Sequence, residues 1–92
     1  MENSKIAIIG CGNLGLSITK GLLKADNIKP EHLRVTKRNI EPITFLSQSG
    51  VKVSTDNKAT VKASDIIVIA VKPYNIKDVI AEIEEELNPE NV

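Results

Sequence analysis

The feature that most restricts the fold of this chain is an apolar run that leads directly into three glycines, in the stretch IAIIGCGNLG at residues 6–15. The first four of these residues are apolar on both faces, which is typical of a strand inside a parallel sheet that helices cover on both sides. Gly10, Gly12 and Gly15 follow with the spacing G-x-G-x-x-G, and helical spacing of apolar residues begins behind them. A strand, a tight turn and a returning helix together predict a β-α-β unit.

Apolar periodicity along the rest of the chain predicts four strand–helix pairs. We expect strands at residues 6–9, 33–36, 51–53 and 66–71, and helices at residues 14–25, near 43–50, within 54–63 and over 76–87. Helical spacing places Leu14, Ile18 and Leu22 on one face of the first helix. The last helix has the clearest apolar face, formed by Ile76, Val79, Ile80, Ile83 and Leu87. This alternation predicts an α/β domain with a mostly parallel sheet and right-handed crossovers.

The hydrophobicity of the strands predicts their order in the sheet. The first and fourth strands are apolar throughout and are expected at the centre, whereas the third alternates and is expected at an edge. The order 3-2-1-4 satisfies both expectations, and it is half of a dinucleotide-binding fold. We therefore expect residues 1–92 to form one three-layer, Rossmann-type α/β domain that binds NAD(P).

The glycine turn has a separate physical reason for each glycine. Gly10 would permit the tight turn, Gly12 would let a pyrophosphate approach the backbone, and Gly15 would let the helix pack closely on the strand. The helix N-terminus offers free N–H groups and partial positive charge to an anion. The alternative is a turn whose glycines serve packing alone.

The end of the second strand indicates which dinucleotide is bound. An NAD site has an acid there for the ribose 2′-hydroxyl, and an NADP site has cations for the 2′-phosphate. This chain has Thr36-Lys37-Arg38-Asn39, with no acid before Glu41. Arg38 could hold a phosphate bidentately and stack on adenine. The pattern favours NADPH over NADH, and a solvated basic turn is the alternative.

Several other residues were weighed as functional candidates. Lys72 in the turn Val71-Lys72-Pro73 follows the fourth strand, where ligands bind in open sheets, although a surface lysine is the alternative. We expect Cys11 to be a small filler in the glycine turn and not a nucleophile, and His32 to be a surface residue. The acidic run at residues 82–86 is interpreted as a solvated face, and no metal-ligand spacing occurs.

The composition excludes several classes of partner. Twelve basic residues balance twelve acidic ones, so nothing indicates nucleic acid or an anionic membrane. One cysteine excludes an internal disulfide and suits a reducing cytoplasm. No apolar run approaches the ~20 residues that span a bilayer.

Three stretches, KIAIIGCGNLGLSITKGLL, LRVTKRN and GVKVSTDNKATVKASDIIVIAVKP, together resemble the N-terminal half of pyrroline-5-carboxylate reductase. The resemblance implies an enzyme that reduces a cyclic imine acid to proline with NAD(P)H, in proline biosynthesis. It implies cofactor contacts at Gly10, Gly12, Asn13, Leu14 and Gly15, at Thr36, Lys37, Arg38 and Asn39, at Asn57, and at Val71, Lys72 and Pro73. Many members carry Ala in place of Gly15, which is a conservative change.

The chain departs from this family in length, since family proteins carry a second, all-helical domain that dimerises and binds substrate. No catalytic residue can therefore be carried over. The alternatives are another reductase of the same superfamily, such as a prephenate or deazaflavin-linked enzyme, and a stand-alone NADPH-sensing module.

The apolar fourth strand leads to one more expectation. It has no polar alternation, proline or charge to protect an open edge, and unprotected edges recruit other strands. We expect the chain to be a truncated piece whose fourth strand is unpaired along one side. Such a piece would form a homodimer through that edge, cover it, or aggregate.

Overall fold

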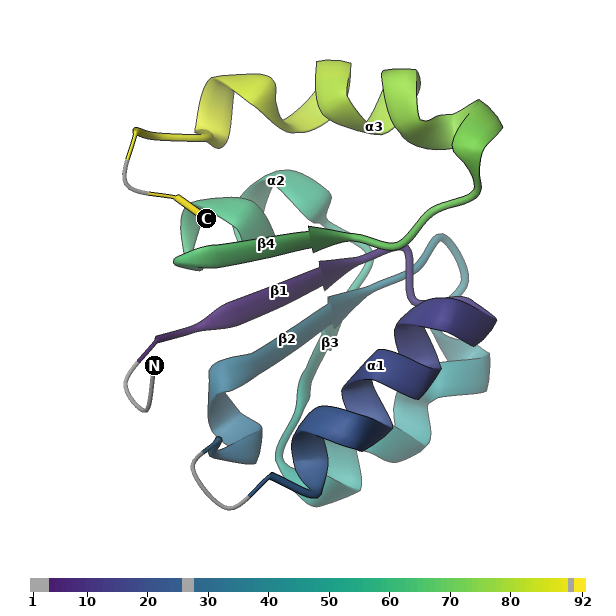
Figure 1. The fold of residues 1–92 in the computed structure, drawn as a ribbon. Helices are drawn as coiled ribbons and strands as arrows, with labels where there is room; N and C mark the ends of the chain where they lie inside the picture. The colour runs from purple at the N-terminus through teal and green to yellow at the C-terminus, as the bar shows by residue number, and fades with distance from the viewer. Residues whose placement is uncertain (1–3, 26–27, 90) are drawn as a thin grey trace.

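The computed structural model describes residues 4–25, 28–89 and 91–92, and within them it has one parallel sheet with the order β3-β2-β1-β4 (Figure 1). The strands are β1 (Ile6–Ile9), β2 (Leu33–Thr36), β3 (Lys52–Ser54) and β4 (Ile66–Ile69). β1 pairs with β2 on one side and with β4 on the other, both in parallel. The predicted strand order is confirmed.

Helices cover both faces of this sheet. They are α1 (Asn13–Leu23), α2 (Asn57–Lys62) and α3 (Ile76–Ile83), with the 3-10 helices η1 (Pro30–His32), η2 (Glu41–Ser49), η3 (Pro73–Asn75) and η4 (Glu84–Glu86). Figure 1 shows α1 and η2 on one face, and α2 and α3 on the other. The predicted three-layer Rossmann-type α/β architecture is therefore confirmed.

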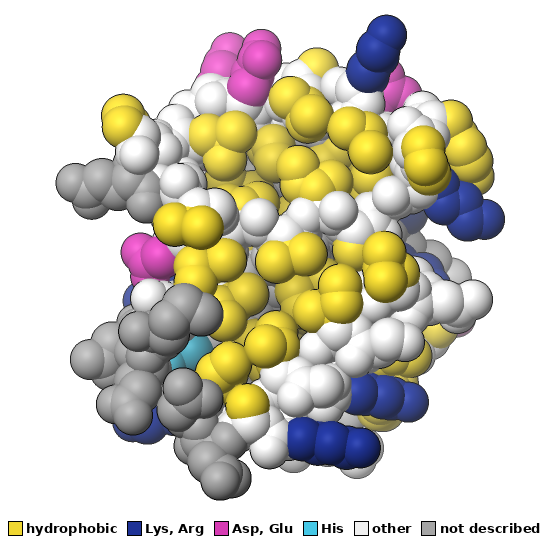
Figure 2. Space-filling view, viewed as in Figure 1, with side chains coloured by type: hydrophobic (Ala, Val, Ile, Leu, Met, Phe, Trp, Pro, Cys, Tyr) yellow, Lys and Arg dark blue, Asp and Glu magenta, His cyan; other side chains and the backbone are white. Residues whose placement is uncertain are grey.

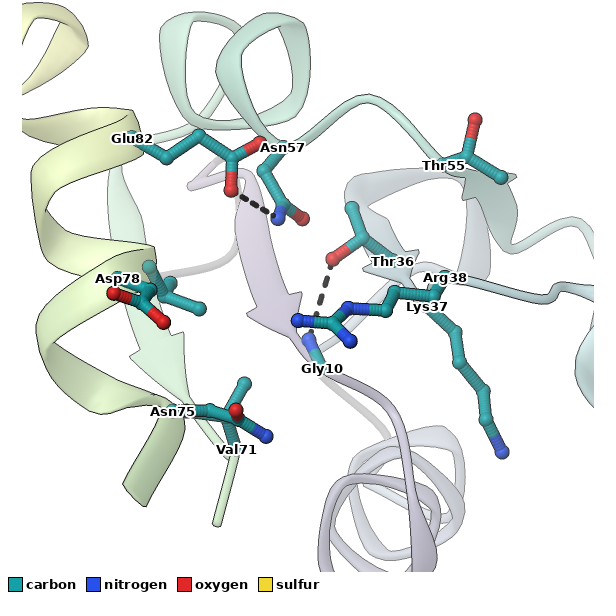
Figure 3. Close-up of a pocket in the computed structure, with 11 residues that line it drawn as sticks. Gly10, Thr36, Lys37, Arg38, Thr55, Asn57, Val71, Asn75, Asp78 and Glu82 are labelled. Carbon is teal, nitrogen blue, oxygen red and sulfur yellow. Dashed lines mark hydrogen bonds between the residues drawn. The ribbon is translucent and has the colours of Figure 1, made fainter. Parts of the chain in front are cut away.

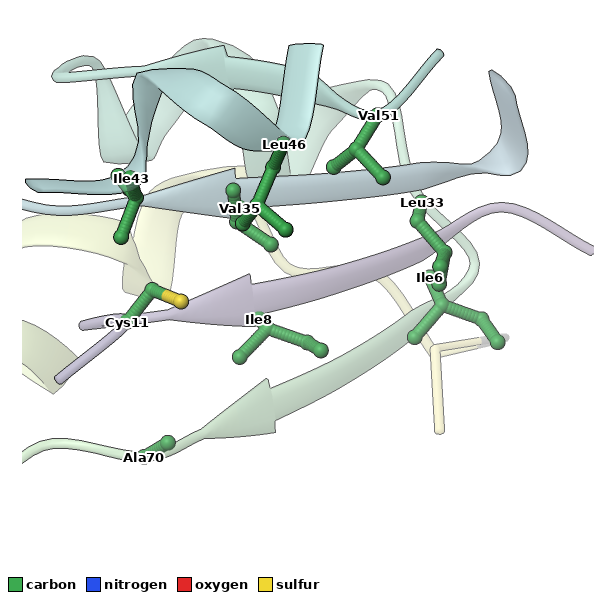
Figure 4. Packing of buried hydrophobic residues seen from close by; sticks show 9 residues of the cluster. All are labelled: Ile6, Ile8, Cys11, Leu33, Val35, Ile43, Leu46, Val51 and Ala70. Carbon is green, nitrogen blue, oxygen red and sulfur yellow. The ribbon is translucent and has the colours of Figure 1, made fainter. Parts of the chain in front are cut away.

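The alternating side chains of β1 divide the apolar interior in two. Ile6 and Ile8 point into a cluster with α1 and η2, which Figure 4 shows. Its other buried members are Cys11, Leu33, Val35, Ile43, Leu46, Val51 and Ala70. Ala7 and Ile9 point to the opposite face and form a smaller cluster with Val61 of α2 and Ile83 of α3. All four residues of β1 are buried, as expected for a central strand.

Several local details differ from the sequence expectations. The helix expected over residues 76–87 is α-helical only over Ile76–Ile83 and continues as a 3-10 helix over Glu84–Glu86. The helix expected near residues 43–50 is a 3-10 helix, and it ends at Gly50 with φ of 97°. β4 ends at Ile69 and not at Val71, because the chain turns after the N–H of Ala70 donates to the Ile9 carbonyl at 2.9 Å. The expectation that Leu14 belongs to the packing face of α1 is wrong, since Leu14 is 62% exposed. Leu14 lies in the first turn of α1, and the buried residues of this helix are Gly15 and Thr19.

The outer edge of β4 is paired at its beginning, contrary to the expectation of an edge that is open along its whole length. The N–H of Val92 donates to the carbonyl of Asp65 at 3.0 Å, and the N–H of Ile67 donates to the carbonyl of Val92 at 2.6 Å. This is the hydrogen-bond pattern of a parallel strand pair with Val92 beside Ile66. Further along, Ile69 lines an apolar groove of about 300 Å³ with Leu87 and Val92.

Candidate functional site

A pocket of about 210 Å³ lies at the carboxyl ends of the parallel strands, where ligands bind in open α/β sheets (Figure 3). Its lining residues are Gly10, Thr36, Lys37, Arg38, Thr55, Asn57, Val71, Asn75, Asp78, Val79 and Glu82. They come from the ends of β1, β2 and β4, the segment around α2, and one side of α3. The pocket therefore brings together residues that are distant in sequence.

Gly10 makes the sharp turn out of β1 in a conformation that favours glycine. Its φ is 81°, and a Cβ at this position would overlap the side chain of Val71. The N–H of Gly10 donates to Thr36 Oγ1 at 3.2 Å, and the N–H of Cys11 donates to the Thr36 carbonyl at 2.6 Å. Thr36 is buried, so it holds the glycine turn against the end of β2. The tight turn after β1 therefore requires a glycine at position 10, as the sequence predicts.

Gly12 faces open space at the start of α1. A Cβ added there would meet no protein atom within 4 Å, so packing within the described residues does not require a glycine. Gly12 is the N-cap and has no side chain to cap the helix, and the carbonyl of Gly12 accepts from the N–H of Leu16 at 2.8 Å. The preceding amides of Asn13, Leu14 and Gly15 have no intrahelical partner. An open approach to unpaired N–H groups fits an anionic ligand.

Gly15 serves the packing of α1 on β1. A Cβ there would lie 3.3 Å from the Gly10 carbonyl oxygen and 3.3 Å from Ile8 Cγ2. Gly15 is buried and does not line the pocket. An alanine would fit only if these neighbours moved by a few tenths of an ångström.

The residues that follow β2 are divided between the pocket and the local turn. Lys37 and Arg38 line the pocket. Asn39 does not, and its Oδ1 accepts from the N–H of Glu41 at 3.1 Å. Asn39 thus makes an Asx-type turn that leads into η2. Two cations, with no carboxylate on this side, form one wall of the pocket.

The turn after β4 contributes less than its sequence predicts. Val71 lines the pocket, whereas Lys72 and Pro73 are exposed and lie outside its lining. Pro73 instead begins η3, at a helix position where its missing N–H costs little.

The side of α3 that lines the pocket was missed in the sequence analysis. Asp78, Val79 and Glu82 of α3 and Asn75, its N-cap, follow one another at spacings of three, one and three residues, which is typical of one helix face. The helical periodicity that predicts the apolar face of α3 also predicts a polar stripe beside it, formed by Asn75, Asp78 and Glu82. These residues could therefore have been found from the sequence. Thr55, before α2, had no comparable signal.

The opposing walls of the pocket carry opposite charge. Figure 3 shows Lys37 and Arg38 on one side and Asp78 and Glu82, on α3, on the other. A ligand with phosphate groups would be attracted to the first wall and repelled by the second. The arrangement would therefore favour one orientation of a ligand that carries phosphate at one end.

Cys11 is the filler that the sequence predicts. Its side chain is fully buried in the cluster beneath α1. Burial raises the pKa of the Cys11 thiol, while a hydrogen bond with Thr19 and the charge of Lys37 partly oppose this. A neutral, enclosed thiol is a poor nucleophile.

The described part of the chain has neither a candidate membrane span nor a candidate metal site. No helix there is long and apolar enough to cross a membrane. Residues 4–25, 28–89 and 91–92 also contain no group of three or more His, Cys, Asp or Glu side chains that could hold a metal ion.

Known proteins resemble this chain in both sequence and fold. The pyrroline-5-carboxylate reductase of Methanosarcina acetivorans is 35% identical over the whole chain, which covers 34% of that protein. The structure of a pyrroline-5-carboxylate reductase from Coxiella burnetii is 33% identical over 94% of the chain and 32% of its own, with a TM-score of 0.85. The Plasmodium falciparum pyrroline carboxylate reductase, solved with NADP bound, is 29% identical over 95% of the chain and 31% of its own, with a TM-score of 0.82.

The coverage of these relatives is partial, because the chain spans about a third or less of the length of the curated relatives it matches. The family model described as "NADP oxidoreductase coenzyme F420-dependent" matches residues 5–92. The chain therefore belongs to that family of NADP oxidoreductases, and it is similar to the N-terminal NADP-binding domain of pyrroline-5-carboxylate reductases.

Proposed function

We propose that residues 1–92 bind NADP(H) in the pocket at the carboxyl ends of the strands, with preference for NADPH over NADH. The observation that carries the proposal is that Lys37 and Arg38 line the pocket together with Gly10 of the glycine turn. Cations at the end of the second strand suit a ribose 2′-phosphate, which NADH lacks. The reductase from Plasmodium falciparum, solved with NADP bound, has the same fold.

The start of α1, which lies outside the pocket lining, and the cations of the pocket have distinct tasks in this proposal. The unpaired amides at the start of α1 bind the pyrophosphate, to which Gly12 gives access. Arg38 binds the 2′-phosphate and lies against the adenine, because a planar guanidinium can do both. Lys37 adds positive charge nearby. When bound, NADPH supplies the hydride, and the chain's own residues hold and orient it.

We further propose that the chain is the nucleotide-binding domain of a pyrroline-5-carboxylate reductase, which acts in proline biosynthesis in the cytoplasm. The relatives that carry this name support the proposal. No catalytic residue is assigned within residues 1–92, and we expect no reductase activity from the chain alone. Oxidation of NADPH by added pyrroline-5-carboxylate, at a rate proportional to pure protein, would contradict this expectation.

The assembly that we propose for the chain is a homodimer through the outer edge of β4. Leu87, which lines a groove with Ile67 and Ile69 of β4, is 39% exposed, as are Ile76 (36%) and Ile80 (40%) of α3. Figure 2 shows hydrophobic side chains gathered over the face on which α3 and β4 lie. Val92 occupies only the beginning of the edge. Light scattering over a range of concentrations tests the proposal, and a strictly monomeric chain would contradict it.

Calorimetric titration with NADPH and NADH tests the cofactor preference. Charged hydrogen bonds to phosphate contribute roughly 1.5–3 kcal/mol. The variant Arg38→Ala should therefore bind NADPH about tenfold or more weakly, and NADH should be affected much less. Lys52→Ala, which removes an exposed cation on β3, is the control and should leave both affinities unchanged. Equal losses for the two cofactors in Arg38→Ala would contradict the preference.

A further inference from the structure

A hydrogen bond between two side chains joins α2 to α3 at the pocket. Asn57 Nδ2, at the first residue of α2, donates to Glu82 Oε1 at 3.1 Å. The two residues are 25 positions apart in sequence, and both line the pocket. Asn57 is half-buried, and Glu82 is exposed on the polar stripe of α3. Figure 3 shows the contact at the side of the pocket opposite the cations.

The chemistry of this contact fixes the direction of the Asn57 amide. An amide side chain has a donor end and an acceptor end of nearly the same shape, so its orientation depends on its partners. An ionised carboxylate only accepts hydrogen bonds, so Glu82 selects the NH₂ end of Asn57. Figure 3 shows Oδ1 of Asn57 turned away from Glu82.

Hydrogen bonds at the N-terminus of α2 fix the backbone on which Asn57 lies. Asp56 Oδ1 accepts from the N–H of Ala59 at 3.0 Å, which fixes the first turn of α2. The Asp56 N–H in turn donates to Ser54 Oγ at 2.9 Å, which ties the turn to the end of β3. The backbone of Asn57 is thus held in place, and the rotation of its amide is the freedom that Glu82 removes.

We infer that Glu82 is a positioning residue that holds Oδ1 of Asn57 free to accept a hydrogen bond from the dinucleotide. This inference rests on the proposed function. The group that Oδ1 binds must be a donor, such as a ribose hydroxyl or the nicotinamide carboxamide. Phosphate oxygens are excluded as partners of Oδ1, because they too are acceptors. The contact therefore assigns Asn57 to an uncharged, hydrogen-donating part of the cofactor.

The competing role for Glu82 predicts a change of opposite sign. If Glu82 acted only as a negative charge on the pocket wall, it would repel the phosphates of NADPH, and its removal would strengthen binding. If Glu82 positions Asn57, its removal frees the amide to rotate and weakens binding. The sign of the change in affinity distinguishes the two roles.

The experiment is calorimetric titration of the 92-residue chain with NADPH. Glu82→Ala should weaken binding about threefold to tenfold, the effect of one misdirected hydrogen bond. Glu82→Gln should restore most of the lost affinity, because its amide oxygen can accept from Asn57 without the charge. Glu85→Ala removes a charge from an exposed residue of η4 outside the pocket, and is the control for long-range electrostatics. The double variant Asn57→Ala/Glu82→Ala should bind no more weakly than Asn57→Ala alone.

A second pair of variants keeps the inference testable if Glu82→Ala does not fold. Asn57→Asp places a carboxylate against Glu82 and should weaken NADPH binding, and adding Glu82→Gln should recover part of the loss.

The outcomes separate the two levels of the proposal. A folded wild-type chain that binds no NADPH would overturn both the proposed function and the inference. Normal wild-type binding, with Glu82→Ala binding as tightly or more tightly, would overturn the inference alone. So would Glu82→Gln binding as weakly as Glu82→Ala, or additive losses in the double variant.

Discussion

The two faces of the sheet are covered to different extents by their helices. Under α1 and η2, nine buried residues form one cluster, and nine partly buried ones pack against it. Under α2 and α3 only Ala7, Ile9, Val61 and Ile83 are fully buried. Ile80 and Leu87, on the apolar face of the last helical segment, stay 40% and 39% exposed. An amphipathic helix buries its whole apolar face only where the sheet beneath it is wide enough. β4, which has four residues, is the outermost strand of the sheet on the side of β1 away from β2.

The cofactor pocket lies between these unequal faces. The well-packed side supplies the glycine turn and the cations at the end of β2, which Thr36 joins through two hydrogen bonds. The less covered side supplies the polar stripe of α3, which is joined to α2 by Asn57 and Glu82. The groups that we propose to bind phosphate thus stand on the wall with more buried contacts. The groups that we propose to orient the rest of the ligand stand on the wall with fewer.

The largest expected effect on the free energy of unfolding comes from truncating identical side chains on the two faces of β1. Ile8 and Ile9 are adjacent and both 0% exposed, but they enter the larger and the smaller cluster, respectively. Replacing buried Ile with Ala costs roughly 2–5 kcal/mol, depending on how well the site can collapse. We expect the free energy of unfolding to fall by about 4 kcal/mol in Ile8→Ala and about 2 kcal/mol in Ile9→Ala. Urea denaturation measures both, and equal losses would refute the difference between the faces.

A second pair of variants separates packing from ligand access in the glycine turn. Gly10→Ala combines a positive φ with overlap onto Val71 and should cost roughly 2–4 kcal/mol of stability. At Gly12 an added Cβ would meet no protein atom within 4 Å, so Gly12→Val should cost less than about 1 kcal/mol. Gly12→Val should nevertheless weaken NADPH binding by more than tenfold, since its side chain occupies the approach of the pyrophosphate. Unchanged affinity in a folded Gly12→Val chain would mean that the turn does not face the ligand.

The sheet and the glycine turn could be predicted because their causes are local in sequence. Residues 6–9 are apolar throughout, which identifies a central strand, and the glycine spacing specifies the turn that follows it. The spacing of the apolar residues in η2 is also consistent with its 3-10 form. Ile43 and Leu46 are the buried pair and are three residues apart, as a 3-10 helix requires, while Phe45 is 47% exposed.

The remaining site residues depend on tertiary structure and could not be read from short windows. Whether Lys72 faces the pocket depends on how the chain leaves β4, and whether Asn39 does depends on a hydrogen bond to Glu41. The contact between Asn57 and Glu82 needs the packing of α2 beside α3. The exposure of Leu14 depends on how far α1 extends past the sheet.

The buried thiol on the better covered face should make stability depend on pH. Burial raises the pKa of Cys11, so the neutral thiol is favoured in the folded chain. The stabilisation is complete below the ordinary thiol pKa of about 8.5, and it is lost as pH rises toward the folded-state value. Between pH 7.5 and 9.5 we therefore expect the wild type to lose more stability than Cys11→Ala, which has no thiol to titrate. Urea denaturation at both pH values checks this, and identical losses would show that the thiol is not enclosed.

The smallest expected effect lies on the less covered face, at Ile80. This side chain is 40% exposed, whereas Ile83, three residues later on the same helix, is 0% exposed. Ile80→Gln should change the free energy of unfolding by less than about 0.5 kcal/mol, because partly exposed positions lose little on substitution. Ile83→Gln is the matched comparison and should cost at least about 2 kcal/mol, since it buries an amide without a partner. If copies of the chain associate through this face, Ile80→Gln should also lower the associated fraction measured by light scattering. A large loss of stability in Ile80→Gln, without a change in association, would mean that α3 is packed as fully as α1 and that the two faces do not differ.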